Sequence, residues 1–282
     1  MKSEYYHKRV QIVFRILLHA FLIIGSFIMA FPFIWMLLSA FKPSSEIISI
    51  PIKIFPVKWT LSHFIQVFTE LDIPRAYINS VFISLAITIL VLFSSAAGGY
   101  LFAKLKFKCK ELLFFYILIS LMMPSNLVII PLFFMFGRLG LLNSYIALII
   151  PFAMSSFGIF LLRQFISGIP DSYLDSARID GATDFKIYRL IIIPLAKPAL
   201  SVIGILTFIW SYDELIWPLV VVNTLDMRTL PLVLAHFSAG ASGAYPGQSM
   251  AASILVILPM IIIYLFFQKD FIKGMTMVGL KY

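Results

Sequence analysis

Charged side chains are concentrated in one polar segment, residues 169–199, of a chain that is otherwise strongly apolar. Three acids and one arginine occupy its first part: Asp171, Asp175, Asp180 and Arg178. Helices that bind lipid favour Lys and Arg on their polar face, whereas anionic headgroups would repel this acidic one. The pattern therefore favours a surface that binds another protein, with an interfacial helix resting on lipid as the alternative.

The same segment has the spacing of two short helices joined by a turn. Pro170 suits the first position of a helix. Gly181 is expected just after the end of the first helix, because glycine reaches the left-handed conformation at little cost. Thr183 or Asp184 can cap the second helix, and Pro194 is expected to break it before the next apolar run.

Side-chain spacing also predicts the contacts within these two helices. Asp171, Asp175 and Arg178 lie three or four residues apart, so they can neighbour one another on the first helix. The second helix is expected to carry four apolar side chains on one side: Phe185, Tyr188, Ile191 and Ile192.

Two acids, Asp213 and Glu214, fall inside an apolar run, where charges are costly and usually face an interior or a cavity. Trp210, Glu214 and Trp217 are spaced to share one side of a helix, and Pro218 cannot pair with the carbonyl of Glu214. Aromatic faces beside hydrogen-bonding groups would suit a sugar. The alternative is a structural role or a contact with another subunit. The candidate pathway residues are Trp210, Tyr212, Asp213, Glu214 and Trp217.

The chain carries no recognisable catalytic set. No phosphate-binding loop of the type G-x-x-x-x-G-K-[ST] is present. The four histidines are scattered without the spacing of metal ligands: His7, His19, His63 and His236. We therefore expect no catalytic, cofactor-binding or metal-binding residues, and no enzyme activity. If ATP drives a process here, the ATPase must be a separate chain.

The elements that position these residues are expected to lie in a membrane. Apolar residues make up 61% of the chain and charged residues 12%, against about 45–50% and about 25% in soluble domains. Six apolar runs approach the roughly 20 residues of a spanning helix: about 14–40, 77–103, 112–136, 145–163, 199–222 and 250–268. The fold is therefore predicted as an all-α integral membrane protein with six transmembrane helices.

Charge and loop composition complete the predicted organisation. Of the 22 Lys and Arg residues, 16 fall on one side of the predicted membrane, which places both termini in the cytoplasm. Residues 1–282 are expected to form a single transmembrane domain, with the polar segment, about 164–198, between the fourth and fifth helices. Residues 41–76 are expected to pack on the outer membrane surface, and residues 223–249 to form a flexible outer loop. The net charge of +9 would suggest nucleic acid only in a soluble protein.

The polar segment contains a recognisable motif. The string D-S-A-R-I-D-G, then nine residues, then I-I-I-P resembles the EAA loop of binding-protein-dependent ABC importers. Ile193 stands where that pattern has Leu. The strings A-R-I-D-G-A and P-L-A-K-P-A-L are similar to those of the carbohydrate branch of this family, and in particular to its maltose-G-type permease subunit. Further similar strings, among them P-F-I-W-M-L-L-S-A-F-K, extend the resemblance over nearly the whole chain.

The resemblance implies a permease subunit of an ATP-driven sugar importer in a bacterial or archaeal cytoplasmic membrane. Its partners would be a second homologous permease, two ATPase subunits that bind ATP and Mg²⁺, an extracellular solute-binding protein and the lipid bilayer, with no nucleic acid. The residues implied to couple to the ATPase are Asp175, Ser176, Ala177, Arg178, Asp180, Gly181, Ile191 and Pro194. The sequence departs from the family at Asp175 and Ser176, and at Asp213 and Tyr212, where Asn and Trp are usual.

Three alternatives stay open. The solute could be something other than a sugar, such as a glycerol phosphate. An ion-coupled secondary transporter could bind its ion at Asp213 and Glu214. Such proteins often show inverted repeats and broken helices near the midplane, and this sequence shows neither clearly. An integral-membrane enzyme is disfavoured because a catalytic set is missing.

Overall fold

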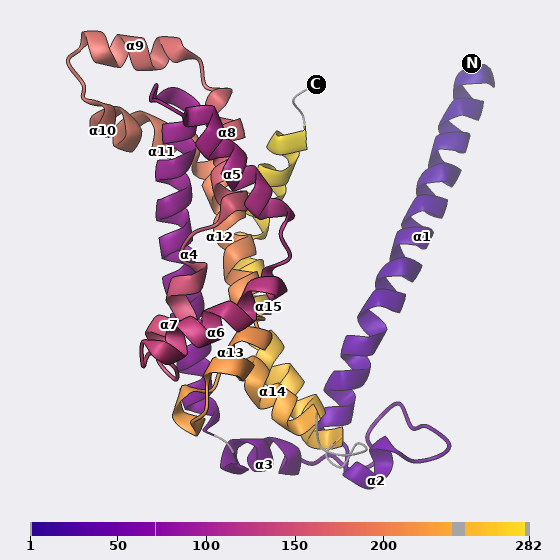
Figure 1. The fold of residues 1–282 in the computed structure, drawn as a ribbon. Coiled ribbons are helices and arrows are strands. Elements are labelled where there is room, and N and C mark those ends of the chain that lie inside the picture. Colours follow the sequence, from indigo (N-terminus) through magenta and orange to yellow (C-terminus); the bar gives the residue numbers. More distant parts are fainter. Residues whose placement is uncertain (1, 71, 239–245, 280–282) are drawn as a thin grey trace. The chain divides into compact units, whose positions relative to one another are not determined.

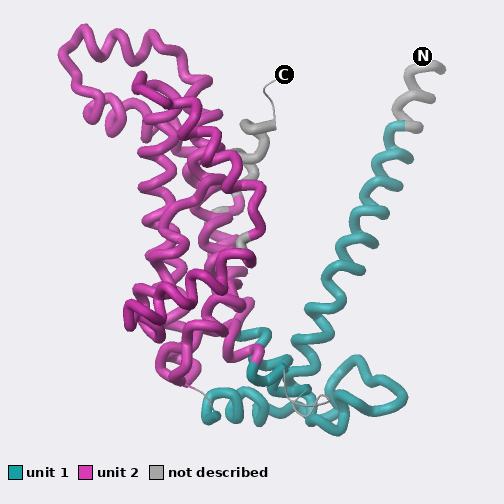
Figure 2. The backbone as a smooth tube through the Cα atoms, in the orientation of Figure 1, with its two compact units in different colours: residues 1–70, 236–255 teal, residues 71–235, 256–282 magenta. Residues whose placement is uncertain are grey.

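The computed structural model describes residues 2–70, 72–238 and 246–279, and every regular element in those ranges is helical (Figure 1). The chain divides into two units, residues 1–70 with 236–255 and residues 71–235 with 256–282 (Figure 2). The first unit contains α1 (Lys2–Ala40), α2 (Ser44–Ile47) and α3 (Ser62–Glu70). Residues 246–255, the beginning of α15 (Pro246–Gly279), also belong to it, whereas the rest of α15 belongs to the second unit.

The second unit contains the remaining helices. The α-helices are α4 (Ile73–Lys104), α5 (Lys110–Met122), α6 (Ile129–Arg138), α7 (Tyr145–Ile149), α8 (Ser156–Ser167), α9 (Asp171–Ile179), α10 (Asp184–Ile187), α11 (Ile193–Leu195), α12 (Lys197–Tyr212), α13 (Ile216–Val221) and most of α14 (Leu230–Ser238). Three 3₁₀ turns, η1 (Ser125–Val128), η2 (Ile150–Phe152) and η4 (Leu225–Met227), and one π turn, η3 (Tyr188–Ile192), join them.

Helices α4 and α8 pack so closely that only glycine fits at some positions between them. A Cβ added to Gly99 would lie 2.5 Å from the Cβ of Leu162, and one added to Gly158 would overlap the hydroxyl of Ser95. Small residues allow this approach of helix backbones within a membrane. The pair, with α12, surrounds a core of apolar side chains that includes Ile83, Ile87, Val91, Leu162, Ile166 and Ile203.

The far end of α4 from Lys104 is also tied down by polar contacts. Asp72 accepts a hydrogen bond from the backbone N–H of Arg75, which caps the helix. The Asn79 side-chain amide donates to the carbonyl oxygens of Asp226 and Arg228, at 2.8 and 2.9 Å, and its oxygen accepts from the Tyr145 hydroxyl. One helix therefore organises both ends of this unit.

Four helical stretches are long and apolar enough to cross a membrane: Gln11–Ala40, Ile73–Lys104, Tyr145–Ser167 and Pro246–Phe266. Two further pairs of helices pass the same test together but are bent, by 92° between Met122 and Asn126 and by 75° between Leu195 and Lys197. The described residues thus hold four straight candidate spans, or up to six if each bent pair is one span.

Two predicted runs differ from the structure. The run 112–136 is not one straight helix, because α5 ends at Met122 and Pro124 introduces η1 before α6. The run 199–222 is interrupted between α12 and α13. The expected flexible loop 223–249 was wrong over Leu230–Ser238, where the apolar sequence forms α14. It was also wrong over residues 246–249, which begin α15, and residues 239–245 lie outside the described residues.

Candidate functional site

The helix α9 ends in a complete glycine turn. Gly181 has a φ of +75°, as its position in the sequence predicted. Its N–H donates to the carbonyl of Arg178, and the N–H of Ala182 donates to that of Ala177. These two bonds satisfy carbonyls that the end of a helix leaves unpaired. A Cβ at Gly181 would meet nothing within 4 Å, so the conformation alone, and not crowding, requires glycine there.

The second helix begins as expected and continues further than expected. The Thr183 hydroxyl accepts a hydrogen bond from the N–H of Lys186, which caps α10. The break expected at Pro194 before the next apolar run is present, but it lies two residues later. The backbone passes from α10 through the π turn into α11, and Ala196 still donates to the carbonyl of Ile192. The wider π turn just before Pro194 accommodates the missing proline N–H, so the bend comes at Ala196.

The same π turn changes which side chains are buried. A π turn adds a residue per turn, so side chains before and after it do not follow the 3.6-residue period. Ile187 and Ile192 are fully buried, whereas Phe185, expected on the apolar side, is 70% exposed. Tyr188 and Ile191 are half-buried and pack against the core.

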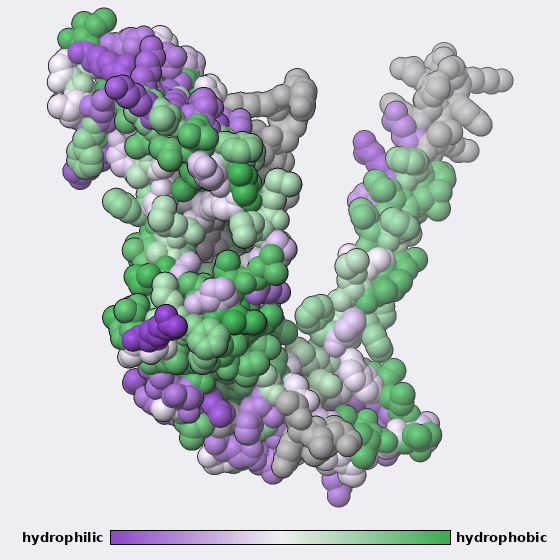
Figure 3. All heavy atoms as spheres, in the orientation of Figure 1, coloured by the Kyte–Doolittle hydropathy of each residue, from purple (hydrophilic) through white to green (hydrophobic). Residues whose placement is uncertain are grey.

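The residues that match the EAA pattern are divided between the surface and the core, because Ala177 and Ile191 are half-buried and pack against the core. Leu174 faces the core, whereas the side chains toward solvent include Asp175, Ser176, Arg178 and Asp180. Figure 3 shows that hydrophilic residues gather at this end of the unit. Exposed apolar side chains accompany them: Tyr173, Ile179 and Phe185. The surface is therefore of mixed character, as protein interfaces are.

Arg178 braces the two helices of this segment. Its guanidinium lies 3.2 Å from Asp184 Oδ1 and 3.5 Å from Asp175 Oδ1. The hydrogen bond with Asp184 raises the pKa of Arg178 above its usual value. Because all three side chains are exposed, these ion pairs stabilise the segment only weakly. Only the pair with Asp184 joins α9 to α10, because Asp175 and Arg178 both belong to α9.

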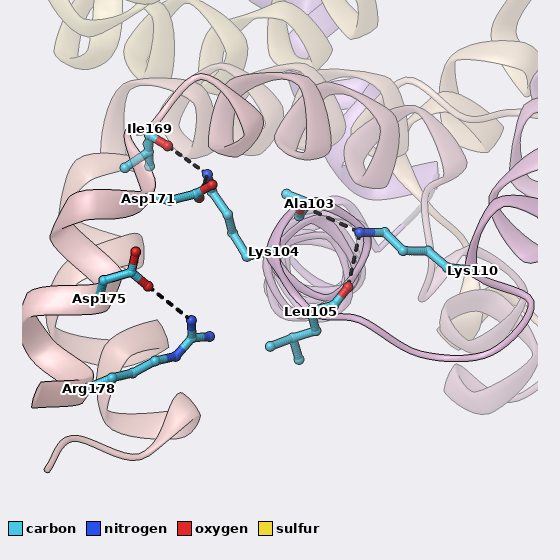
Figure 4. A network of polar contacts seen from close by, with 8 residues as sticks. All are labelled: Ala103, Lys104, Leu105, Lys110, Ile169, Asp171, Asp175 and Arg178. Atoms are coloured by element: carbon cyan, nitrogen blue, oxygen red, sulfur yellow. Dashed lines mark hydrogen bonds and ion pairs between the residues drawn. The ribbon is translucent and has the colours of Figure 1, made fainter.

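A lysine at the end of α4 attaches α9 to the membrane core (Figure 4). The Lys104 ammonium donates to the carbonyl of Ile169 and to Asp171 Oδ1, both at 2.6 Å. Its side chain is 6% exposed, while that of Asp171 is 74% exposed. The expected contact of Asp171 with Asp175 and Arg178 was therefore wrong, because Lys104 takes the Asp171 carboxylate. The hydrogen bond from Lys104 holds the pKa of Asp171 below its ordinary value of 3.8.

A second contact joins α4 to the π turn η3, which follows α10. The Tyr100 and Tyr188 rings lie with their centroids 5.6 Å apart. Lys110 donates to the backbone carbonyl of Leu105, at 3.0 Å, and so gives this carbonyl, just beyond the end of α4, a hydrogen-bond partner (Figure 4). Sequence reasoning did not identify Lys104 or Tyr100. The only signal for Lys104 was its place where an apolar run gives way to a basic stretch.

The predicted pathway residues lie around a helix break. α12 ends at Tyr212, and Asp213 follows as its cap residue with an exposed side chain. Glu214 Oε1 accepts hydrogen bonds from the N–H groups of Ile216 and Trp217, at 3.0 and 3.1 Å, and so caps α13. The expected continuous helix through Trp210 and Trp217 was wrong, because the acid side chain replaces the backbone hydrogen bonds there.

Trp210, Glu214 and Trp217 nevertheless line the same two cavities. The first is also lined by Ser80, Tyr212 and Thr229, and its volume of about 10 Å³ is only enough for about one water. Within the described residues, neither the Tyr212 nor the Thr229 hydroxyl there has a hydrogen-bond partner. The second, of about 170 Å³, is also lined by Asn126, Leu132 and Phe152. Asp213 lines neither of them.

The two tryptophans differ in their roles. Trp217 is fully buried and donates from Nε1 to the carbonyl of Ala147, at 2.8 Å. Trp210 is 49% exposed, and its ring packs edge-on against Phe152 with centroids 5.5 Å apart. Trp210 and Glu214 are therefore the predicted pathway residues that a solute in the larger cavity could reach. Asn126 is a further polar group that sequence reasoning missed.

Known permease proteins are similar to this chain in sequence. The chain is 37% identical over 91% of its length to the "Arabinooligosaccharides transport system permease protein AraQ" of Halalkalibacterium halodurans, and covers 92% of that protein. It is 31% identical, over 91% of its length and 93% of the relative, to the "Lactose transport system permease protein LacG" of Rhizobium radiobacter.

A solved structure and a family comparison agree with these relatives. The structure is that of a bacterial ABC transporter involved in the import of the acidic polysaccharide alginate, with a TM-score of 0.80 and 26% identity, over 91% of this chain and 96% of that one. Residues 95–276, which include α8 to α14, match one family. The chain belongs to the family described as "Binding-protein-dependent transport system inner membrane component".

Proposed function

We propose that this chain is a membrane-spanning permease subunit of an ATP-driven importer for a sugar or oligosaccharide. The observation that carries the proposal is the exposed α9 surface, with Asp175, Ser176 and Asp180, fixed to the end of α4. It supports docking of a separate ATPase subunit. Relatives named for transport of arabinooligosaccharides and lactose support a carbohydrate solute.

The proposed assembly contains this chain, a second homologous permease, two ATPase subunits that bind ATP and Mg²⁺, and an extracellular solute-binding protein. The family description, which names a binding protein and an inner membrane, supports the last of these and a cytoplasmic membrane of a bacterium or archaeon. If each bent pair of helices is one span, the six spans place both termini on one side. The positive-inside rule assigns that side to the cytoplasm.

In this mechanism the chain itself does no bond-breaking chemistry. ATP binding and hydrolysis on the ATPase would move the docked α9, and Lys104 and Tyr100 would pass that displacement to α4. Opening of the helix break beside Glu214 would then give solute access to the larger cavity. Trp210 offers an aromatic face and Glu214 a hydrogen-bond acceptor, which together suit the apolar face and hydroxyls of a sugar.

Transport by the assembled complex in proteoliposomes tests the function. We expect ATP-dependent uptake of an arabino-oligosaccharide or lactose that requires the solute-binding protein and is unaffected by a protonophore. Uptake without ATP that a protonophore abolishes would show an ion-coupled transporter instead. Uptake of sn-glycerol 3-phosphate but of no sugar would leave the permease role intact and overturn the proposed solute class.

Cysteine labelling tests the topology independently of transport. Ser44→Cys and Ser172→Cys, each with Cys109→Ser, place a thiol at an exposed site on each proposed side of the membrane. A membrane-impermeant thiol reagent added to intact cells should label position 44 and spare position 172. The opposite pattern would invert the topology and remove α9 from the cytoplasm.

A further inference from the structure

An apolar loop, residues 48–59 between α2 and α3, exposes large hydrophobic side chains outside any long helix (Figure 1). Six of them are between 66% and 96% exposed: Ile48, Ile50, Ile52, Phe55, Val57 and Trp59. Lipid contact accounts for similar exposure on spanning helices, but this loop is not part of one. A fixed patch of this kind usually marks a surface that contacts a membrane or another molecule.

Inward-facing polar contacts hold the loop in position. The Lys42 ammonium donates to the carbonyl of Lys53 at 2.6 Å and lies 4.0 Å from the centroid of the Trp35 ring. Lys42 itself is fully buried. Glu46 accepts a hydrogen bond from the N–H of Val57, at 2.9 Å. The polar anchors therefore face the protein, and the apolar side chains are left pointing outward.

The loop lies close to the end of a candidate span, with only α2 between them in the chain. The span that starts at Gln11 ends at Ala40, and Phe41 follows directly. The Phe41 backbone carbonyl accepts from the N–H of Thr60, at 2.9 Å, and the Phe41 and Trp59 rings lie 5.9 Å apart. The Trp59 end of the loop is thus held next to the end of α1. This places the loop at the level of the membrane boundary.

The polar composition of the loop fits that boundary. Lys53 and Lys58 are exposed among the apolar side chains, and lysine beside tryptophan is typical of a membrane interface. Pro51 and Pro56 have no backbone N–H, so the loop has fewer donors to leave unpaired near lipid.

We propose that residues 48–59 insert their apolar side chains into the headgroup–acyl boundary of the outer leaflet, with Lys53 and Lys58 at the lipid phosphates. The leaflet follows from the proposed topology, whereas the lipid contact does not depend on transport. The loop would then be a second membrane contact of the first unit, beside α1. It would fix how deeply the end of α1 lies in the bilayer.

An environment-sensitive fluorophore on the loop tests this contact in the assembled complex. Ile50→Cys in a Cys109→Ser background carries the label, and Ser45→Cys, exposed in the neighbouring α2, is the matched control. In nanodiscs of phosphatidylcholine and phosphatidylglycerol without the solute-binding protein, the label at position 50 should emit at shorter wavelength than that at position 45. Lipid that carries a nitroxide near its headgroup should quench it, and aqueous iodide should not.

Two outcomes would overturn the proposal. Equal emission at both positions, with quenching by iodide, would show that the loop lies in water. A blue shift at position 50 that appears only after the solute-binding protein is added would show a protein partner instead of lipid. As a second variant, Lys53→Glu with Lys58→Glu should reduce the quenching by nitroxide lipid when phosphatidylglycerol is present. Unchanged quenching would remove the two lysines from the contact.

Discussion

The ammonium group of Lys104, at the last residue of α4, contacts Asp171 in the first turn of α9, 67 residues further along the chain. The same ammonium holds the carbonyl of Ile169. The lysine is buried and the aspartate is exposed, so the two partners contribute unequally. Loss of Lys104 leaves a carbonyl without its donor, whereas loss of the Asp171 charge removes an exposed ion pair.

Lys104→Met should loosen α9 more than Asp171→Asn does. A buried polar group that loses its partner costs about 1–3 kcal/mol, whereas an ion pair with an exposed carboxylate contributes little. Amide hydrogen exchange in α9 should become faster in Lys104→Met, and uptake per ATP hydrolysed should fall. Lys108→Met, at an exposed lysine nearby, is the control. Slow exchange in α9 of Lys104→Met would show that this attachment is not needed.

The contact should be insensitive to pH across the physiological range. Lys104 lowers the pKa of Asp171 from 3.8, so the folded state favours the charged carboxylate. The contribution is therefore complete above the unfolded pKa and is lost as the pH falls through the lower folded pKa. Co-purification of the ATPase should not change through Asp171 between about pH 8 and about pH 5. If Asp171→Asn alone abolished a change within that window, the depressed pKa would be wrong.

Variants at two glycines with similar backbone conformations can distinguish the effect of backbone strain from the loss of ATPase docking. Gly181 and Gly140 have φ values of +75° and +67°, and a Cβ on either would meet nothing within 4 Å. Valine at each should cost about 1–3 kcal/mol of backbone strain. Only Gly181→Val should lower ATPase co-purification, and Gly181→Asn should be milder because Asn tolerates this conformation. Equal losses in both valine variants would point to general destabilisation.

Neighbouring glycines on α4 test the close packing against α8. Gly99→Ala would place a Cβ 2.5 Å from Leu162 Cβ and 3.1 Å from its backbone, whereas Gly98→Ala meets only the Ile159 side chain, at 3.1 Å or more. Overpacking against backbone costs about 1–3 kcal/mol. Thermal unfolding in detergent should show a clearly lower Tm for Gly99→Ala than for Gly98→Ala. Similar Tm values would mean that the helices separate easily.

Glu214→Gln should lower sugar uptake several-fold while the complex stays assembled. The glutamine oxygen can still accept from the N–H groups of Ile216 and Trp217, so the start of α13 is preserved. Only the charge beside the larger cavity is lost. Asp213→Asn is the matched control, because Asp213 lines neither cavity. Near-normal uptake per assembled complex in both variants would leave Glu214 as a helix cap alone.

Local rules predicted the parts of the site that depend on neighbouring residues. The Gly181 turn and the Thr183 cap follow from the conformational freedom of glycine and the short hydroxyl side chain. Apolar length placed the four candidate spans, because a bilayer demands about 20 apolar residues. These features need no knowledge of the rest of the chain.

The remaining features depend on contacts that no local pattern records. The π turn before Pro194 and the exposed Phe185 follow from how the segment packs. The pairing of Lys104 with Asp171 joins distant residues. The break after Tyr212 could not be predicted from the sequence. Pro218 indicates only that one backbone N–H is missing, whereas the break depends on the Glu214 side chain, which accepts the hydrogen bonds at the start of a new helix.

The close packing of α4 also determines what a displacement at one membrane surface does at the other. α4 has 32 residues and is about 48 Å long. At Gly99 and Gly158 it lies too close to α8 for a Cβ to fit between the two helices. Lys104 at one end holds α9, and Asn79 near the other holds Asp226 and Arg228. One continuous helix therefore links the segment that carries α9 to residues 226–228, so a tilt of α4 at Lys104 would also displace those residues.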